Sequence, residues 1–177
     1  SLISTRKTAK AAFQLFCTPL VKPPRHIPSI FKKAEPLNEI LDGKKIKGYR
    51  WNKNQPVKIL ILHGFSSAAY KFHMYIEPLV KKGYEVIAFD APAHGGSQGK
   101  TINALQYKAM IELLVEKYGP FTGYFTHSFG GLALSLAMEN IPHDAATKIV
   151  LVAPATETTT AIDIAFKMLK LRSKKVR

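Results

Sequence analysis

Ser128 stands where a predicted strand turns into a predicted helix. The segment FTGYFTHSFGG, residues 121–131, begins as an aromatic and β-branched run and leads into the apolar stretch 132–138. A nucleophilic serine at such a turn is held out from the chain in a strained backbone conformation, and small neighbours let the strand and the helix approach each other. Gly130 is one such neighbour, so Ser128, preceded by His127, is the candidate nucleophile for an acyl transfer.

The position two residues before this serine departs from the usual pattern. It holds Thr126, whereas nucleophile turns of the form G-x-S-x-G carry glycine there. A β-branched side chain crowds a place where a small residue fits easily. The alternative interpretation is an ordinary serine in a strand-to-helix loop made flexible by Gly130 and Gly131.

A second loop, LHGFSS at residues 62–67, follows the first strand of the predicted parallel series. An acyl transfer needs two donors for the carbonyl oxygen as it becomes an oxyanion, and backbone N–H groups supply them in such loops. The candidates are the N–H groups of Phe65 and Phe129, with His63 and Gly64 shaping the loop. A metal ligand or general base is the alternative for His63, but no second ligand stands at suitable spacing beside it. We expect no metal and no cofactor.

The third loop, FDAPAHGGS at residues 89–97, follows the next predicted strand. Asp90 and His94 are four residues apart, and an Asp and a His at that spacing can orient one another as catalytic groups. Taken alone, the loop indicates only a turn-rich connection.

These three loops are positioned by alternating strands and helices. Short β-branched apolar runs of strand length occupy residues 57–62, 84–89, 121–126 and 147–153. Apolar residues recur at helical spacing between them, in residues 68–82, 101–118 and 129–140. Helical crossovers of this length predict a doubly wound α/β fold with a mostly parallel sheet, in which the carboxyl ends of the strands carry the ligand site.

The chain divides into three predicted parts: residues 1–56, the α/β core at 57–155, and residues 156–177. The first part combines a helix at 9–16, with Ala12, Phe13 and Phe16 on one side, a Pro-rich arm at 19–28 and a candidate antiparallel edge strand at 45–51. We expect the helix to pack on the sheet or on a neighbouring subunit, and a membrane surface is the alternative. The last part is expected to begin a cap or lid helix over the site.

The net charge of +14 suggests nucleic acid until it is divided along the chain. Residues 1–58 carry 13 Lys and Arg against 3 Asp and Glu, residues 59–165 carry 7 against 9, and residues 166–177 carry 6 against none. The loops lie in the nearly neutral middle, and no zinc-finger or aromatic–basic signature accompanies the flanks, so we expect solvated faces and no specific nucleic-acid partner.

The remaining composition bears on location. No apolar run approaches the roughly 18 residues that a membrane span needs, and residues 1–10 lack the apolar core of an export signal. Cys17 is the lone cysteine, which excludes an intramolecular disulfide and fits a reducing cytoplasm. We therefore expect a cytoplasmic protein without a membrane span. Its oligomeric state stays open.

The succession HGF, DAPAHGGS and HSFGG, on strands at these intervals, resembles the α/β-hydrolase superfamily over residues 57–154. Residues 11–19, AAFQLFCTP, are similar to the N-terminal extension of a bacterial esterase-like subgroup. The resemblance implies that Ser128 is the nucleophile, that Phe65 and Phe129 donate to the oxyanion, and that Asp90 and His94 are scaffold. A serine nucleophile disfavours the relatives that use a carboxylate, namely dehalogenases and epoxide hydrolases.

In that superfamily the triad follows the chain order Ser, Asp or Glu, His, with the base near the C-terminus. No acid-bearing or His-bearing loop follows the predicted cap or lid helix at 156–177, so we expect the triad acid and base in a missing C-terminal part and favour a fragment over a natural truncation. The predicted function is a serine hydrolase that forms an acyl-enzyme with a small-molecule ester. The alternatives are a non-catalytic ligand-binding or scaffold protein on the same fold, and a basic protein that binds nucleic acid or a membrane surface.

Overall fold

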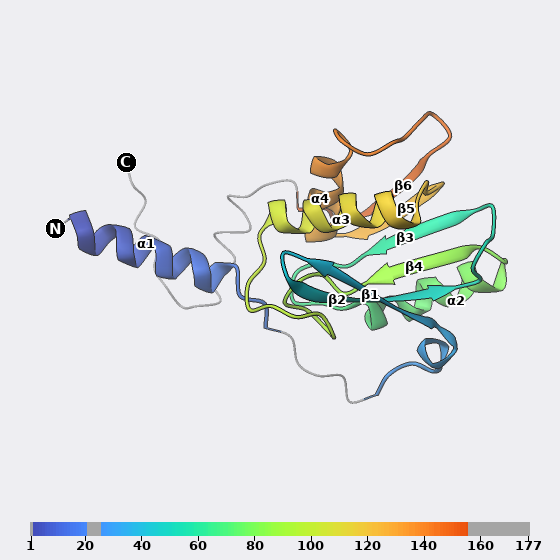
Figure 1. Ribbon diagram of the computed structural model, residues 1–177, viewed down its shortest axis with the longest axis horizontal. Coiled ribbons are helices and arrows are strands. Elements are labelled where there is room, and N and C mark those ends of the chain that lie inside the picture. Colours follow the sequence, from blue (N-terminus) through green and yellow to red (C-terminus); the bar gives the residue numbers. More distant parts are fainter. Residues whose placement is uncertain (1, 21–25, 156–177) are drawn as a thin grey trace.

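The computed structural model describes residues 2–20 and 26–155, whose strands form one sheet in the order β1-β2-β4-β3-β5-β6 (Figure 1). The pairs β3–β4, β3–β5 and β5–β6 are parallel, and the pairs β1–β2 and β2–β4 are antiparallel. This mostly parallel sheet confirms the predicted α/β fold. The strands are β1 (Glu35–Leu41), β2 (Lys44–Trp51), β3 (Lys58–Leu62), β4 (Glu85–Phe89), β5 (Gly123–His127) and β6 (Lys148–Val152).

Helices cover both faces of this sheet. The α-helices α3 (Ala104–Tyr118) and α4 (Phe129–Ala137) pack on one face, and the other face carries α2 (His73–Lys81) with the 3-10 helices η1 (Ser29–Lys33) and η2 (Ala69–Phe72). Successive strand residues point to opposite faces, so Leu60 and Leu62 of β3 join the α3 and α4 side while Ile61 joins the α2 side. This explains why the central strands read as continuous apolar runs.

The antiparallel hairpin corrects one expectation. β2 covers the predicted strand at 45–51 but is not the edge, because the unpredicted strand β1 pairs outside it. Asp42 and Gly43 form the two-residue connection, both with positive φ (48° and 71°), as a tight hairpin turn requires. Glu39 of β1 is buried, with its carboxylate bonded by Lys117 and Tyr118 of α3. These hydrogen bonds, from residues far away in the sequence, permit a charged residue to be buried in the sheet.

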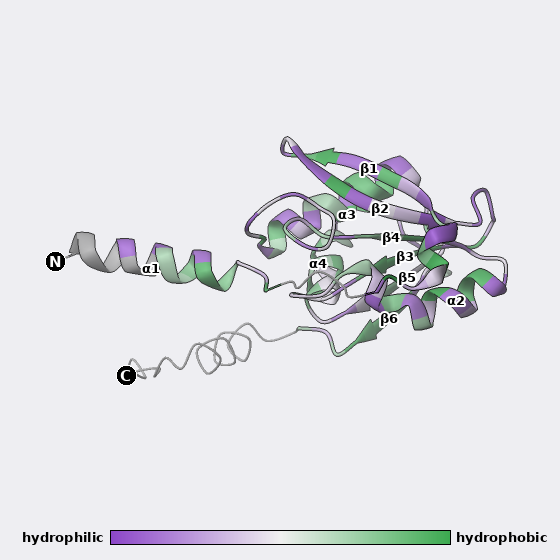
Figure 2. Ribbon diagram, turned by 90° about the horizontal axis from the view of Figure 1, so that it is seen from below, coloured by the Kyte–Doolittle hydropathy of each residue, from purple (hydrophilic) through white to green (hydrophobic). Residues whose placement is uncertain are grey.

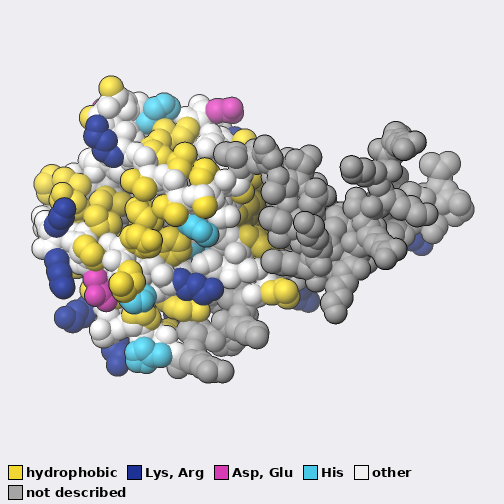
Figure 3. Space-filling view, turned by 180° about the vertical axis from the view of Figure 1, so that it is seen from behind, with side chains coloured by type: hydrophobic (Ala, Val, Ile, Leu, Met, Phe, Trp, Pro, Cys, Tyr) yellow, Lys and Arg dark blue, Asp and Glu magenta, His cyan; other side chains and the backbone are white. Residues whose placement is uncertain are grey.

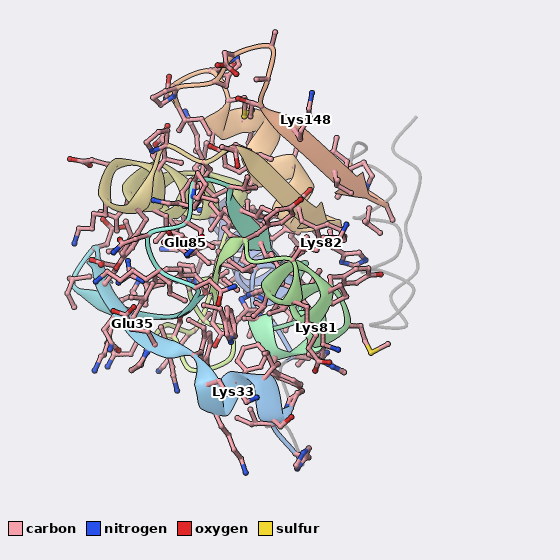
Figure 4. The ribbon with its side chains drawn as sticks, turned by 90° about the vertical axis from the view of Figure 1, so that its right-hand side faces the viewer. Lys33, Glu35, Lys81, Lys82, Glu85 and Lys148 are labelled. Atoms are coloured by element: carbon pink, nitrogen blue, oxygen red, sulfur yellow. The ribbon has the colours of Figure 1, made fainter. Side chains whose placement is uncertain are left out.

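The parallel strands share one polarity, so their beginnings and ends lie at opposite ends of the sheet. Figure 4 views the end where Glu85 opens β4 and Lys148 opens β6. Buried Glu85 accepts a hydrogen bond from the N–H of Asn54 and lies 4.0 Å from the Nζ of Lys58. The three loops that carry the candidate residues follow β3, β4 and β5 at the other end.

At the other side of the sheet from β1, β6 pairs with β5 alone among the described strands. Ile149, Val150 and Leu151 are 42%, 47% and 46% exposed, so β6 presents apolar side chains at a strand edge. Figure 3 shows the α2 side of the molecule, where apolar side chains gather over a broad area. Exposed apolar surface of this extent is typical of a surface that another segment or partner covers.

The N-terminal helix α1 (Leu2–Phe16) includes the predicted helix at 9–16 and begins seven residues earlier. It extends away from the sheet at the end where β3 and β4 finish (Figure 1), contrary to the expected packing on the sheet. From Lys10 to Phe16 every residue is exposed, including Phe13, Leu15 and Phe16, and Cys17 is buried. The helix that does pack, α3, starts at a capping box formed by Asn103 and Gln106.

No helix in the described part of the chain is long and apolar enough to cross a membrane. The predicted cap or lid helix at 156–177 lies outside the described residues. The division of the chain at residues 57 and 155 stays a prediction.

Candidate active site

Ser128 lies between the end of β5 and the start of α4, with φ 49° and ψ −116°. A positive φ costs free energy for a residue with a Cβ, so the surrounding structure must hold this conformation. The N–H of Ser128 donates to Val152 O, and its carbonyl accepts from the N–H groups of Gly131 and Ala155. The backbone is therefore fixed from both sides. Within the described residues the hydroxyl of Ser128 has no hydrogen-bond partner and is half-buried.

Two glycines allow this turn to pack closely. A Cβ at Gly130 would come within 2.7 Å of the carbonyl oxygens of both Leu62 and His63, which belong to the backbone of the neighbouring strand and loop. A Cβ at Gly64 would lie 2.7 Å from His127 Nδ1 and 3.1 Å from Ser128 Cβ. The loop after β3 and the turn at Ser128 are thus in direct contact, and only glycine fits at either position.

Thr126 is accommodated in a different way. It is fully buried, and its Oγ1 donates to Val150 O at 3.3 Å. A Cβ at Gly131 would lie 3.2 Å from Thr126 Oγ1 and 3.2 Å from Pro154 Cβ. Nucleophile turns usually carry a small residue two positions before the serine. Here that position is Thr126, and the small residue that leaves room for its side chain is Gly131 in α4.

The side chains of the two residues predicted to supply the oxyanion donors lie next to each other. The rings of Phe65 and Phe129 are 5.7 Å apart in an edge-to-face arrangement, and both residues are partly buried. Neither backbone N–H has an acceptor in the chain from residue 26 to residue 155. The N–H of Phe129 is the first in α4, where the helix dipole favours negative charge. Two unused N–H groups beside a serine are what an oxyanion site requires.

His63 is fully buried and holds two of the loops together. Its Nε2 accepts from the N–H of Ala91 at 2.9 Å, so its Nδ1 carries the proton and donates to Gly64 O at 2.8 Å. Burial lowers the pKa of His63 to about 4, so the ring is neutral at pH 7. A ring with both nitrogens engaged is a poor base, and the described part of the chain contains no cluster of metal-ligating side chains around it.

His94 repeats this arrangement from the opposite loop. Its Nε2 accepts from the N–H of Ser66 at 3.0 Å, and its Nδ1 donates to Pro92 O at 2.9 Å. Burial also lowers the pKa of His94 to about 4. The two histidine rings are 5.0 Å apart, each accepting a backbone N–H from the other's loop.

Asp90 does not hydrogen-bond His94. Its two carboxylate oxygens accept from the N–H groups of Ala69 and Gly96, at 2.8 and 2.9 Å. Burial raises the pKa of this carboxyl group, whereas the two N–H donors act in the opposite direction. Asp90 therefore connects its own loop to the start of η2.

Three contributors to the site were not predicted. Tyr107 of α3 donates its hydroxyl to His63 O, Ser97 donates to Asp90 O, and the N–H of Leu20 donates to Ser66 Oγ. In the sequence, Tyr107 is recognisable only as an apolar position of a predicted helix. Its partner is a backbone carbonyl 44 residues away, and no pattern around Tyr107 predicts that hydrogen bond. The structure thus brings Ser128, Phe65, Phe129, His63 and His94 together, with His127 half-buried beside Gly64.

Comparison with known families matches this sequence to a hydrolase family. The model described as serine aminopeptidase, S33, matches residues 54–177, a range that includes all three loops of the site. This chain belongs to that hydrolase family. The resemblance to the α/β-hydrolase superfamily is confirmed.

Relatives of this hydrolase support the same grouping. A Mycoplasma pneumoniae protein named "Putative esterase/lipase 2" is 28% identical over 131 residues, covering 72% of this chain and 46% of that protein. The Pyrococcus furiosus esterase Pf2001 superposes with a TM-score of 0.63 over 89% of this chain and 63% of its own, at 22% identity. A thioesterase domain from the curacin biosynthetic pathway gives a TM-score of 0.59 at 21% identity, over 77% of this chain and 53% of that domain.

At 21% and 22% identity the two structural likenesses show the fold alone. The chain spans about half the length of the Mycoplasma relative and of the thioesterase domain.

Proposed function

We propose that this hydrolase cleaves small-molecule esters or related acyl compounds, with Ser128 as the nucleophile. The observation that carries the proposal is the strained Ser128 with its unbonded hydroxyl, beside two backbone N–H groups without acceptors. Strain and unsatisfied donors cost folding free energy, and they are retained where reactivity needs them.

In the first half of the reaction Ser128 Oγ attacks the acyl carbon while its proton passes to a base. The carbonyl oxygen becomes an oxyanion that accepts from the N–H groups of Phe65 and Phe129. The tetrahedral intermediate collapses, the leaving alcohol departs with a proton, and an acyl-enzyme remains on Ser128. Water then attacks the acyl carbon by the same route, releasing the carboxylic acid and restoring the serine.

The base and the acid that orients it are proposed to come from residues outside 2–20 and 26–155. His63 and His94 have both ring nitrogens engaged, and the carboxylate oxygens of Asp90 accept from backbone N–H groups. The match to this chain covers only 46% of the Mycoplasma relative and 53% of the thioesterase domain, and the apolar edge of β6 is suited to further strands. The full-length protein is thus expected to supply the missing groups.

The substrate class is supported by what the relatives are named for. The family description names a serine aminopeptidase, and the relatives are named an esterase/lipase, an esterase and a thioesterase. All these names denote attack on an acyl carbon, so a serine acyl-enzyme serves each of them.

A fluorophosphonate probe tests the nucleophile directly. The full-length protein should be labelled at Ser128, and Ser128→Ala should abolish labelling. Ser135→Ala is the matched control, because Ser135 lies on the same helix, is exposed and donates to Gly131 O. Labelling at another residue, or none in a preparation that hydrolyses a p-nitrophenyl ester, would contradict the assignment and favour a ligand-binding role for this fold.

A further inference from the structure

The N-terminal segment differs from the rest of the chain in charge. Residues 1–34 contain seven Lys and Arg and no Asp or Glu, and the first acidic residue is Glu35. Segments of this composition are attracted to surfaces of fixed negative charge, and each Lys or Arg close to an anionic lipid surface strengthens binding about fivefold.

Helix α1, within this segment, also exposes apolar side chains. Phe13 is 58% exposed, Phe16 is 37% exposed, and Leu20 just beyond the helix is 83% exposed. Phe13 and Phe16 are three residues apart and therefore neighbour each other on the helix surface, as do Lys7 and Lys10. Since Lys10 is in turn three residues before Phe13, the basic pair borders the aromatic pair. In Figure 2 the end of α1 is mostly hydrophobic, and hydrophilic residues recur along the helix. An exposed helix with aromatic and basic faces is typical of a helix that lies in a lipid interface.

The chain after α1 ties this helix to the candidate active site. Cys17 is buried, and its carbonyl accepts from the N–H of Ile102 at 2.9 Å. Three residues later, the N–H of Leu20 donates to Ser66 Oγ at 3.0 Å. Ser66 directly follows Phe65, the candidate oxyanion donor. The exposed face of α1 therefore begins beside the loop that faces the substrate, at the end of the sheet that carries Ser128 (Figure 1).

We propose that α1 binds the surface of an anionic lipid bilayer and presents the active site to esters held in that surface. The apolar side chains of Phe13, Phe16 and Leu20 enter the boundary between headgroups and acyl chains, while Lys7 and Lys10 face the anionic headgroups. Nucleic acid would satisfy the charge but leaves Leu20, which is 83% exposed, without an apolar partner. The lipid-ester part of this inference rests on the proposed function of Ser128, and the binding part does not.

Vesicle flotation tests the binding part in a Ser128→Ala background, where no ester is consumed. The full-length protein should float with phosphatidylcholine vesicles containing about one third phosphatidylserine, and bind phosphatidylcholine alone much more weakly. Phe13→Ser with Phe16→Ser should weaken binding to the anionic vesicles about tenfold or more. Lys7→Gln with Lys10→Gln should weaken it about twentyfold, a loss that salt reproduces in the parent protein.

Matched controls separate α1 from the rest of the surface. Ile40 and Leu105 are 62% and 69% exposed outside α1, so Ile40→Ser with Leu105→Ser should leave flotation unchanged. The paired charge control is Lys81→Gln with Lys82→Gln at the end of α2. Equal flotation of the α1 variants and the parent, flotation of none, or tighter binding to an oligonucleotide at the same salt would overturn the proposal.

Turnover tests the lipid-ester part. With active protein, Phe13→Ser with Phe16→Ser should lower hydrolysis of an ester dispersed in anionic vesicles about tenfold and leave hydrolysis of a soluble p-nitrophenyl ester unchanged. Equal turnover of the vesicle ester by parent and variant would overturn the lipid-ester inference. Failure of the parent to hydrolyse either ester would refute the proposed function, while the flotation result would stand independently.

Discussion

The histidine-bearing loops and the turn at Ser128 lie in contact but are built in opposite ways. In the loops, each ring nitrogen of His63 and His94 has a backbone partner, and each carboxylate oxygen of Asp90 accepts a backbone N–H. At the turn, Ser128 has a positive φ, its hydroxyl has no partner, and the neighbouring N–H of Phe129 has no acceptor among the described residues. Reactive residue types alone therefore do not identify reactive residues. The groups whose bonding capacity is unused are the ones available to a substrate.

The largest effect is expected from removing the hydroxyl of Ser128, the candidate nucleophile. Ser128→Ala should lower kcat/KM for a p-nitrophenyl ester by about a thousandfold or more, because the nucleophile is lost while the oxyanion donors remain. The midpoint of thermal unfolding should stay nearly unchanged, since the hydroxyl contributes no hydrogen bond in the described structure. Kinetics and calorimetry on the same preparation check both halves. A large loss of stability with little loss of rate would make Ser128 structural.

Lowering the pH tests whether the hydrogen-bonded histidines, His63 and His94, are held neutral. The folded-state pKa values of His63 and His94 are lowered to about 4 by burial, below the ordinary value of 6.5. The unfolded chain therefore binds more protons between those values, so their contribution to stability is full above pH 6.5 and is lost as the pH falls toward 4. For each of these histidines, the free energy of unfolding should be about 2 kcal/mol lower at pH 5 than at pH 7.

Three carboxyl groups with shifted pKa values also contribute to the pH dependence of stability, so a variant must isolate the histidines. The raised pKa of Asp90 acts in the opposite direction, and the lowered pKa values of Glu35 and Glu39 act in the same direction. His94→Gln keeps an acceptor for the N–H of Ser66 but cannot gain the proton. Urea titrations at pH 7 and pH 5 should show a smaller drop for His94→Gln than for the parent. An equal drop would mean that His94 is not held neutral.

A third effect concerns the close contact between the two regions. Gly130→Ala places a Cβ against the carbonyl oxygens of Leu62 and His63, which belong to the backbone and cannot rotate away. We expect a loss of about 1 to 3 kcal/mol of stability, as for other overpacked positions, together with slower labelling of Ser128. The matched control is Gly123→Ala, where the nearest atoms would be 3.5 Å away in ordinary contact. Equal effects of the two substitutions would show that the turn is not tightly held.

Local sequence patterns were sufficient for the central part of the fold. The four parallel strands, the helices between them and the three loops were predictable because apolar period and turn residues act over a few positions. β1 was missed although the Asp42-Gly43 pair is a hairpin signal, because Pro36, Asn38 and Glu39 interrupt its apolar pattern. Only the contacts of Glu39 with α3, almost 80 residues away, make that pattern stable.

The same limit of range applies to the candidate site. Ser128, Phe65 and Phe129 were predicted as candidates from motifs of a few residues each. The roles of His63 and His94 depend on bonds between residues 28 positions apart, which neither loop encodes alone. The orientation of α1 could not be predicted either, because an amphipathic pattern shows that a face will be covered but does not identify what covers it.

The smallest expected effect concerns Thr126, which stands where the usual nucleophile turn has glycine, and its contact with Gly131. If Gly131 leaves room for Thr126, then Gly131→Ala should cost about 1 kcal/mol, because the new Cβ would lie 3.2 Å from Thr126 Oγ1 and from Pro154 Cβ. In a Thr126→Gly background one of these two contacts is gone, so the same substitution should cost less. A double-mutant cycle measured by urea unfolding should therefore give a coupling of about 0.5 kcal/mol or more between the two positions. The matched cycle pairs Thr126→Gly with Gly43→Ala in the β1–β2 hairpin. A Cβ at Gly43 would have no atom within 4 Å, so this cycle should show no coupling. Additive costs at Thr126 and Gly131 would mean that the strand and the helix accommodate the threonine by some other adjustment.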